Sequence, residues 1–551
     1  MNSKLSRWLT IAVLCWLWIG LPAWSVVSAQ ESAKDKLDQG IGDEDGWVRV
    51  FVRMEDQLLP KGGDYERFCK EQAEDVNRLA LRSRVVQTLR EKSDRSRNAL
   101  EEHIANLENA GGLRGVHHYW IVNGFACEAT VAACQELANL EEVNFIYRQR
   151  NKPLRRPGTP KSSNSKPASQ QPELAKIYRK LLKESKEDAD QPFTTEGIEI
   201  PWNLKCVRAD KAWAKHGVTG KGVVIAVLDD GMMAVPALLP ALWTNPNEKL
   251  NGKDDDGNGC VDDVFGYHFN EQSPFCVVQS GARHGTLCAG VVAARPTEGE
   301  KKIATGVAPR AKIMPLIGSA QLSAYEYALE NGADILSISS TREPTKMGNY
   351  RGVFRAAHEH LAAAGVVSVG GAGNYGTKRP VGKQIGSPKD IPCVIAAAGI
   401  RADGKVPQFS SRGPVLWQGT PNYGPDETGN QAKSKPNVTT CIGGYPLWTR
   451  PEIWVGKRAN KLKEIVLEDD AGYVLAIGPQ GNSFSGPHVA GVVALMLEAN
   501  PGLPVWQVQR MLEDTCQDMG ELGRDLTHGE GLVQADKAVQ AALGYHAFSV
   551  N

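Results

Sequence analysis

The alternation of short apolar runs with helical segments after residue 200 constrains the fold more than any other feature of the sequence. Helical segments such as 320–331 and 350–364 separate these runs. The apolar runs are 223–228, 312–316, 333–338, 366–369 and 394–398. Strands that are apolar on both faces and alternate with helices indicate a parallel sheet. We therefore predict an α/β fold, a parallel β-sheet with helices on both faces, over residues 200–545. Its functional groups should gather at the carboxyl ends of the strands.

A separate small α+β domain is predicted over residues 46–150. Residues 47–53 alternate apolar and polar side chains, as a half-buried strand does. Residues 67–108 predict one or two helices, and residues 117–148 predict strand, helix and strand. The segment 151–190 begins rich in Pro, Ser and Lys, which predicts a flexible linker. Its charged end is expected to form a short exposed helix.

Residues 1–29 have the features of a secretory signal peptide. Lys4 and Arg7 precede an uncharged run, and small residues precede Gln30. An uncleaved membrane anchor is the alternative, because the run is nearly long enough to span a bilayer. The 63 basic residues balance the 63 acidic ones, so no overall basic field attracts nucleic acid or acidic lipid. We expect a secreted or periplasmic protein without a nucleic-acid partner and without stable membrane association once the leader is removed.

The cysteines and two histidines carry weaker predictions. The sequence has 11 cysteines and no CxxC pair, which argues against a structural zinc knuckle. Cys260 and Cys276 fall in one loop-rich segment and are the pair we expect to form a disulfide, although pairing cannot be deduced from sequence. His358 and His360 are expected on an exposed helix face.

Four segments carry residues with catalytic chemistry. Each also has a structural explanation when it is taken alone: a turn after a strand, a helix cap, an ordinary loop and a capping serine. The last one opens an apolar helix, where the positive end of the helix dipole stabilises negative charge. The four residues are Asp229 at the end of 223–231, His284 in 283–294, Asn374 in the glycine-rich turn of 366–376, and Ser483 in 481–503.

In this order and context, the four segments resemble those of the subtilisin-like serine peptidases, the subtilase or S8 family. Further matching stretches are 217–223, 306–313, 409–414, 435–438 and 529–543. Residues 46–150 resemble the inhibitory propeptide of the family. The resemblance implies a serine endopeptidase that is made as a self-processing zymogen, acts on proteins or peptides, needs no organic cofactor and is inhibited by its own propeptide. Cleavage is expected between about residues 147 and 174.

The resemblance also assigns roles to residues. Ser483 would be the nucleophile, His284 the general base and Asp229 the group that orients the imidazole. Asn374 and the Ser483 N–H would bind the oxyanion.

The segment 333–343 matches the substrate-binding edge of the family. The residues expected to bind substrate are Ser339, Ser340, Thr341 and Gly373. Thr341 stands where glycine is usual, and its side chain should narrow the first specificity pocket. Two other departures are Asp230 and Asn482, since both positions usually hold threonine. Dibasic specificity, as in the kexin branch, is not expected.

Residues 251–263 resemble a calcium loop. Oxygen-bearing side chains alternate along it, as calcium ligands do in such loops. The candidate ligands for a structural calcium ion are Asp254, Asp256, Asn258 and Asp262. The twelfth-position glutamate of an EF-hand is absent, with Phe265 in its place, and a solvated acidic turn is the alternative. Two rival functions also stay open: a binding protein that has kept the fold without catalysis, and an esterase.

Overall fold

The computed structural model describes residues 35–42, 46–62, 64–72, 78–150, 172–187, 193–278, 283–299, 301–417, 420–423, 435–453 and 462–545. The predicted leader, residues 1–29, and residues 151–171 and 188–190 of the predicted linker lie outside these ranges. Among the helices of the described ranges, none is both long and apolar enough to cross a membrane.

A seven-stranded sheet forms the centre of the larger domain. Its order is β13-β12-β11-β10-β5-β9-β7, and each neighbouring pair is parallel. The strands are β5 (Val224–Asp229), β7 (Tyr267–His268), β9 (Lys312–Ile317), β10 (Ile335–Ser337), β11 (Val367–Gly371), β12 (Ile395–Ile400) and β13 (Val438–Cys441). The strands β10 to β13 are buried along their whole length, as runs of Val, Ile and Ala predict. The predicted α/β fold is confirmed.

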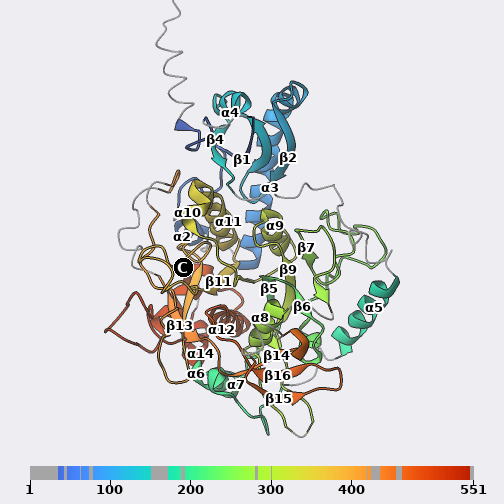
Figure 1. Cartoon of the computed structure of the whole chain (residues 1–551), viewed down its shortest axis with the longest axis vertical. Coiled ribbons are helices and arrows are strands. Elements are labelled where there is room, and N and C mark those ends of the chain that lie inside the picture. Colours follow the sequence, from blue (N-terminus) through green and yellow to red (C-terminus); the bar gives the residue numbers. More distant parts are fainter. Residues whose placement is uncertain are drawn as a thin grey trace, which may run out of the picture.

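Helices cover both faces of this sheet (Figure 1). On one face, α8 (Arg283–Ala293) and α12 (Ser485–Ala499) pack against the strands, and α14 (Ala535–Leu543) and α7 (Ala209–His216) lie outside α12. On the other face lie α9 (Leu322–Glu330) and α11 (Arg351–Ala363). The helix α12 is buried from Ser485 to Leu497, which explains why it is apolar all round.

Shorter elements complete the larger domain. The helices are α6 (Trp202–Cys206), α10 (Pro344–Met347) and α13 (Val505–Asp514), with the 3₁₀ turns η2 (Pro236–Ala241), η3 (Gly348–Tyr350) and η5 (Pro451–Ile453). A two-stranded sheet pairs β6 (Met232–Met233) with β8 (Val277–Val278), and a three-stranded sheet has the order β14 (Pro446–Thr449), β16 (Val474–Ile477), β15 (Glu464–Glu468).

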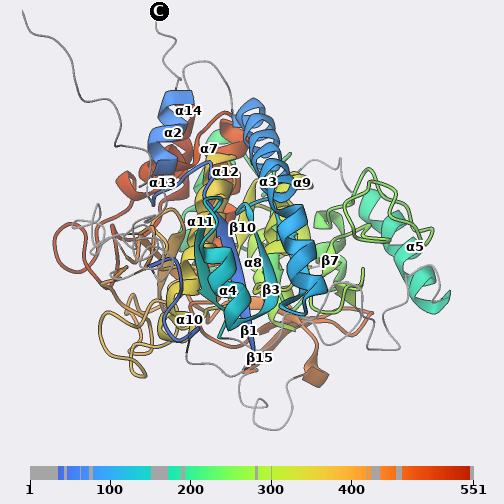
Figure 2. The same ribbon diagram turned by 90° about the horizontal axis from the view of Figure 1, so that it is seen from above.

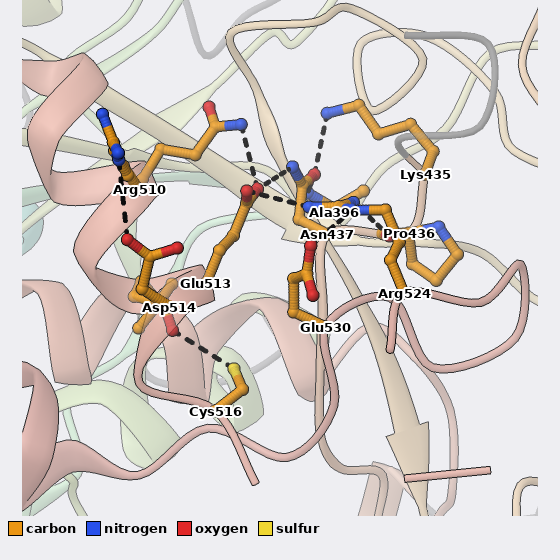
Figure 3. Close-up of polar contacts among 12 residues, drawn as sticks. Ala396, Lys435, Pro436, Asn437, Arg510, Glu513, Asp514, Cys516, Arg524 and Glu530 are labelled. Atoms are coloured by element: carbon orange, nitrogen blue, oxygen red, sulfur yellow. Dashed lines mark hydrogen bonds and ion pairs between the residues drawn. The ribbon is translucent and has the colours of Figure 1, made fainter. Parts of the chain in front are cut away.

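A buried polar cluster fastens the C-terminal part of the domain to the edge of the sheet (Figure 3). Lys435 is fully buried, donates to the Val394 carbonyl and to Asn437 Oδ1, and burial lowers its pKa to about 8. Asn437 donates to Glu513 over 2.7 Å, and Arg524 pairs with Glu513 over 2.8 Å. The cluster therefore joins α13 to the chain that enters β13.

The N-terminal domain is an antiparallel sheet of order β2-β3-β1-β4 with helices. Its elements are β1 (Trp47–Met54), α2 (Asp64–Gln72), α3 (Arg78–Asn109), β2 (Leu113–Tyr119), β3 (Gly124–Thr130), α4 (Val131–Ala138) and β4 (Val143–Arg148). The single strand predicted at the start of 117–148 is wrong, because the chain reverses at 120–123, where Asn123 has a φ of 39°, and forms two strands. The domain lies on the outer side of the layer of α9 and α11 (Figure 1).

The predicted exposed helix at the end of the linker is instead docked on the larger domain. The helix α5 (Pro172–Glu187) buries Ala175, Tyr178 and Leu181, which share one face of the helix. The Tyr178 hydroxyl donates to the Pro274 carbonyl over 2.8 Å. The apolar residues of this charged segment were too few to stand out in the sequence.

Two other expectations are wrong. His358 and His360 are fully buried, because the N-terminal domain and the sheet enclose α11 from both sides. Cys260 and Cys276 are both buried as unbridged thiols, and every cysteine that the structure describes is free.

Candidate active site

The parallel sheet explains the positions of three of the predicted residues. Asp229 is the last residue of β5, Ser339 lies just beyond β10, and Asn374 lies just beyond β11. The strands β5, β10 and β11 are neighbours in the sheet. Their carboxyl ends therefore bring these side chains to one edge.

Asp229 and His284 are in direct contact. The Nδ1 atom of His284 lies 2.8 Å from one carboxylate oxygen of Asp229 and 2.9 Å from the other. Since Nδ1 is engaged in this way, Nδ1 carries the proton of the neutral ring and Nε2 is left as the proton acceptor. Asp229 is nearly buried, with 9% of its side chain exposed, whereas 35% of the His284 side chain is exposed.

Asp230 holds the start of α8 against the end of β5. Its carboxylate accepts hydrogen bonds from the Gly285 N–H over 2.7 Å and from the His284 N–H over 3.3 Å. Both N–H groups belong to the first turn of the helix, where they have no partner within the helix. Threonine, which is usual at this position, has a shorter reach, so the departure noted in the sequence gives Asp230 a positioning contact with the backbone of His284.

Ser483 lies in the turn that leads into α12, directly before Phe484, whose ring contacts His284. Its carbonyl accepts hydrogen bonds from Ser339 Oγ over 2.8 Å and from Cys288 Sγ over 3.5 Å. The ring of the next residue, Phe484, stacks on the His284 ring with 6.0 Å between centroids. The turn can approach β11 so closely only because residue 371 is glycine: a Cβ there would lie 1.7 Å from the Asn482 carbonyl oxygen.

Asn482 and Asn374 fix each other. The Asn374 Oδ1 accepts the Asn482 N–H over 2.9 Å, so this hydrogen bond engages the amide oxygen of Asn374 and not its NH₂ group. The Asn482 side chain is fully buried and donates to the Gly373 carbonyl over 2.7 Å and to Ser410 Oγ over 3.1 Å. The amide that replaces the usual threonine at 482 thus ties the two turns together.

The predicted substrate-binding residues lie along the same edge. Ser339 contacts Ser483, and Gly373 directly precedes Asn374. Ser340 is exposed, and its carbonyl accepts a hydrogen bond from the buried Lys389 amine. The Thr341 methyl group lies close to Gly386: a Cβ added at residue 386 would be 2.5 Å from this methyl carbon. Thr341 therefore fills space beside this edge.

Cys288 is a neighbour of the site that sequence reasoning missed. It lies four residues after His284 on α8, a spacing that places both on one face of the helix and that was visible in the sequence. Its Sγ is 3.9 Å from His284 Nδ1 and 3.4 Å from Ser339 Oγ.

Burial decides which of the groups next to the His284 imidazole carries a negative charge. Negative charge on Cys288, and next Asp229, would raise the pKa of His284. Burial raises the pKa of the Cys288 thiol, however, so the thiol is uncharged near neutral pH. Asp229 is therefore the anion in direct contact with the imidazole.

The acidic loop forms a second group of side chains, apart from this site. Single carboxylate oxygens of Glu248, Asp254 and Asp256 lie within 4.8 Å of one another. Of the other two predicted ligands, Asn258 turns its Oδ1 to the Cys260 N–H, and Asp262 turns its Oδ1 to the N–H groups of residues 251 and 252.

Glu248 and Asp263 were missed in the sequence. Asp263 is fully buried, and its Oδ1 has no hydrogen-bond partner among the described residues. Its Oδ2 accepts hydrogen bonds from Tyr327 Oη and Asn258 Nδ2. Burial, and to a smaller extent the neighbouring Asp263 charge, raises the pKa of Glu248 to about 7. In the sequence, Glu248 lies before the acidic run and Asp263 resembles any other carboxylate of a turn. Only their approach to each other in the fold distinguishes them from the other acidic residues of the loop.

Comparison with known proteins relates this arrangement to one family. A model of the subtilase family matches residues 220–531. Fervidolysin of Fervidobacterium pennivorans is 26% identical over 396 residues, which are 68% of this chain and 48% of fervidolysin. Bacillopeptidase F of Bacillus subtilis is 24% identical over 485 residues, 84% of this chain and 29% of the relative. Subtilisin E of Bacillus subtilis is 25% identical over 385 residues, 66% of this chain and 80% of that protein. The chain thus spans about half of fervidolysin and less than a third of bacillopeptidase F.

Proposed function

We propose, from the premise that this chain belongs to the subtilase family, that it is a secreted serine endopeptidase made as a self-processing zymogen. The observation that carries the proposal is the contact of His284 with both oxygens of Asp229, beside the turn that bears Ser483. An imidazole oriented in this way can act as a general base toward a neighbouring hydroxyl.

The proposed reaction is acyl transfer through Ser483. Its Oγ attacks the carbonyl carbon of the scissile peptide while His284 Nε2 takes the hydroxyl proton. The Asn374 NH₂ group and the Ser483 N–H donate to the oxyanion that forms. His284 then returns the proton to the leaving amine, and water releases the acyl group by the same two proton transfers.

A fluorophosphonate probe tests the nucleophile. We expect the mature chain to be labelled at Ser483, and we expect Ser483→Ala and heat-denatured protein to remain unlabelled. Cleavage of casein, set beside cleavage of simple esters, separates a peptidase from an esterase. A folded mature chain that takes up no label and cleaves neither substrate would contradict the proposal and favour a binding protein.

The zymogen part of the proposal concerns residues 46–150 as a propeptide and a cut between about residues 147 and 174. Ser483→Ala should accumulate as a precursor that still carries residues 46–150, because self-cleavage needs the nucleophile. N-terminal sequencing of the exported product locates the processing points. Maturation of Ser483→Ala in the absence of another protease would contradict self-processing.

We also propose that the acidic loop binds a structural calcium ion through Glu248, Asp254, Asp256 and Asp263. Calcium prefers several oxygen ligands, and the bare buried Oδ1 of Asp263 beside Glu248 supports a cation at this point. In this proposal Asn258 and Asp262 shape the loop through their backbone contacts.

The calcium site is tested by melting and by titration calorimetry on Ser483→Ala, which avoids self-digestion. We expect chelation to lower Tm and added Ca²⁺ to restore it. Asp263→Asn should remove the response, whereas Asp255→Asn, a change at an exposed carboxylate of the same loop, should keep it. Equal melting with and without chelator would contradict the site.

A further inference from the structure

Lys389 is a buried cation behind the edge where substrate is proposed to bind. Its side chain is fully buried, and its amine donates a hydrogen bond to the carbonyl of Ser340, an exposed residue just beyond β10. Lysine is almost never fully buried in proteins unless it is paired. The acyl transfer proposed for Ser483 gives this amine no role.

The surrounding chain makes room for Lys389 and fixes it in place. The stem of the side chain passes β11 at Gly370, where a Cβ would lie 2.7 Å from Lys389 Cδ. The segment that carries the lysine is attached to the substrate edge, because Arg342 and Ser387 exchange two backbone hydrogen bonds of 2.9 and 3.0 Å. The position of the amine therefore depends on both β10 and β11.

The positive charge of Lys389 is not balanced by a hydrogen-bonded carboxylate. In the part of the chain that the structure describes, its amine has the Ser340 carbonyl as acceptor and no carboxylate oxygen at salt-bridge distance. A charged lysine has three N–H groups, so two of them lack an acceptor there. A buried cation in this condition is stabilised by an anion that is brought to it.

The two carboxylates nearest in their effect on Lys389 are already engaged. Asp390 pairs with Arg351 over 4.0 Å, and burial raises the pKa of Asp390, which favours its neutral form. Asp229 attracts the lysine at longer range, but its oxygens are held by His284. Neither carboxylate therefore neutralises the amine.

The remaining neighbours are positive or neutral. Arg342 lies over the Phe354 ring and donates to Ser319 Oγ, and its charge lowers the pKa of Lys389. His358 lies on α11, which packs against β11 (Figure 2), and burial lowers its pKa to about 3, so it is neutral. Burial lowers the pKa of Lys389 itself to about 7, and an anion beside it would restore the charged form.

A substrate side chain would reach this cation between the ends of two strands. The carbonyl that Ser483 attacks would lie beside Asn374, just beyond β11, so the side chain of the same residue would enter between the carboxyl ends of β10 and β11. The Thr341 methyl group, close to Gly386, narrows this entrance. A slim side chain that ends in a carboxylate fits such a space better than an aromatic ring.

We propose that Lys389 determines specificity: its ammonium group attracts the carboxylate of an acidic residue that directly precedes the scissile bond. This inference rests on the proposed peptidase activity and names the class of peptide that the site prefers. Because the amine must hold its proton when the peptide arrives, the preference is full below about pH 7 and declines as the pH rises above that value.

The experiment measures kcat/KM of the mature chain on two fluorescent peptides that differ only in the residue before the scissile bond. One peptide has Glu and the other has Gln at this position, and mass spectrometry confirms the cut. Between about pH 6 and about pH 9 the glutamate stays ionised, and the titration of His284 cancels in the ratio of the two constants. We expect the Glu peptide to be favoured about 10–100-fold at the lower pH, as a charge-assisted hydrogen bond provides, and the ratio to fall toward about 1 at the higher pH.

Lys389→Met should lower the ratio to about 1 throughout this pH range. Lys383→Met, a change at an exposed lysine that precedes it in the same loop, should keep the ratio of the parent. If melting shows that Lys389→Met is unfolded, the pH series of the parent provides the test by itself.

Equal cleavage of both peptides, or a ratio that does not change with pH, would overturn the inference and leave the peptidase activity in place. Cleavage of neither peptide would instead remove the proposed function, as the fluorophosphonate probe would also show, and the inference would fall with it.

Discussion

The side-chain amide of Asn374 has an acceptor oxygen and a donor NH₂ group, and this leads to a prediction that separates a catalytic from a merely structural role. Its Oδ1 accepts the Asn482 N–H over 2.9 Å, so its NH₂ group is the part left to donate to an oxyanion. Asn374→Leu removes both functions. Asn374→Asp keeps the acceptor but replaces the donor with a negative charge.

The expected magnitudes differ in a way that can be measured. Loss of one oxyanion donor costs about 10²–10³ in kcat, a range known from subtilisin, which is itself a member of this family. A carboxylate about 4 Å from the oxyanion adds about 4 kcal/mol of repulsion at an effective dielectric constant of about 20. That is about a further 10³-fold. Asn374→Asp should therefore be the slower enzyme, although it preserves more of the resting structure.

The assay is kcat and KM on a fluorescent casein substrate for the parent and both variants. Melting curves confirm that each variant is folded. KM should change little, because the lost interaction belongs to the transition state. If Asn374→Asp is nearly as active as the parent while Asn374→Leu is slow, Asn374 serves only to hold the turn at Asn482, and the reasoning is refuted.

Three further predictions concern buried groups. Burial lowers the pKa of His488 to about 4, so the unfolded chain takes up a proton first and the free energy of unfolding falls by about 3 kcal/mol as pH drops from about 6.5 to about 4. In urea unfolding, the free energy of unfolding of His488→Gln should fall less over this pH range than that of the parent. An equal fall would refute the assignment of the pH dependence to His488. Gly371→Ala should cost about 1–3 kcal/mol and most activity, because a Cβ there meets a backbone oxygen at 1.7 Å. Gly290→Ala, where a Cβ meets nothing within 4 Å, should cost nothing measurable in the same melts. Cys288→Ala should leave the acid limb of the pH profile of kcat/KM unchanged, because a neutral thiol cannot set the pKa of the imidazole; a shift to lower pH would show that Cys288 is ionised.

The residues of the candidate active site could be recognised because each stands in a local context that the chemistry requires. Asp229 ends a buried strand, Asn374 follows another, and Ser483 opens a buried helix. Local patterns were enough to predict the sheet, whose parallel strands bring such positions together, but the choice of these residues rested on the resemblance of four segments to one family.

The remaining features depend on contacts between distant segments, which local patterns do not carry. Asp230 caps a helix that begins more than 50 residues later, and the burial of His360 depends on a domain that precedes it. Asp263 became a candidate ligand only when the fold left its Oδ1 bare. The sequence of α3 predicted a helix, but not that Arg78 at its start pairs with Asp334 of the larger domain.

Arg78 at the start of α3 pairs with Asp334 just before β10, whereas Thr341 lies beyond the carboxyl end of the same strand. Substitutions that alter how the two domains are joined and substitutions that alter which peptide is accepted would therefore fall at opposite ends of one strand.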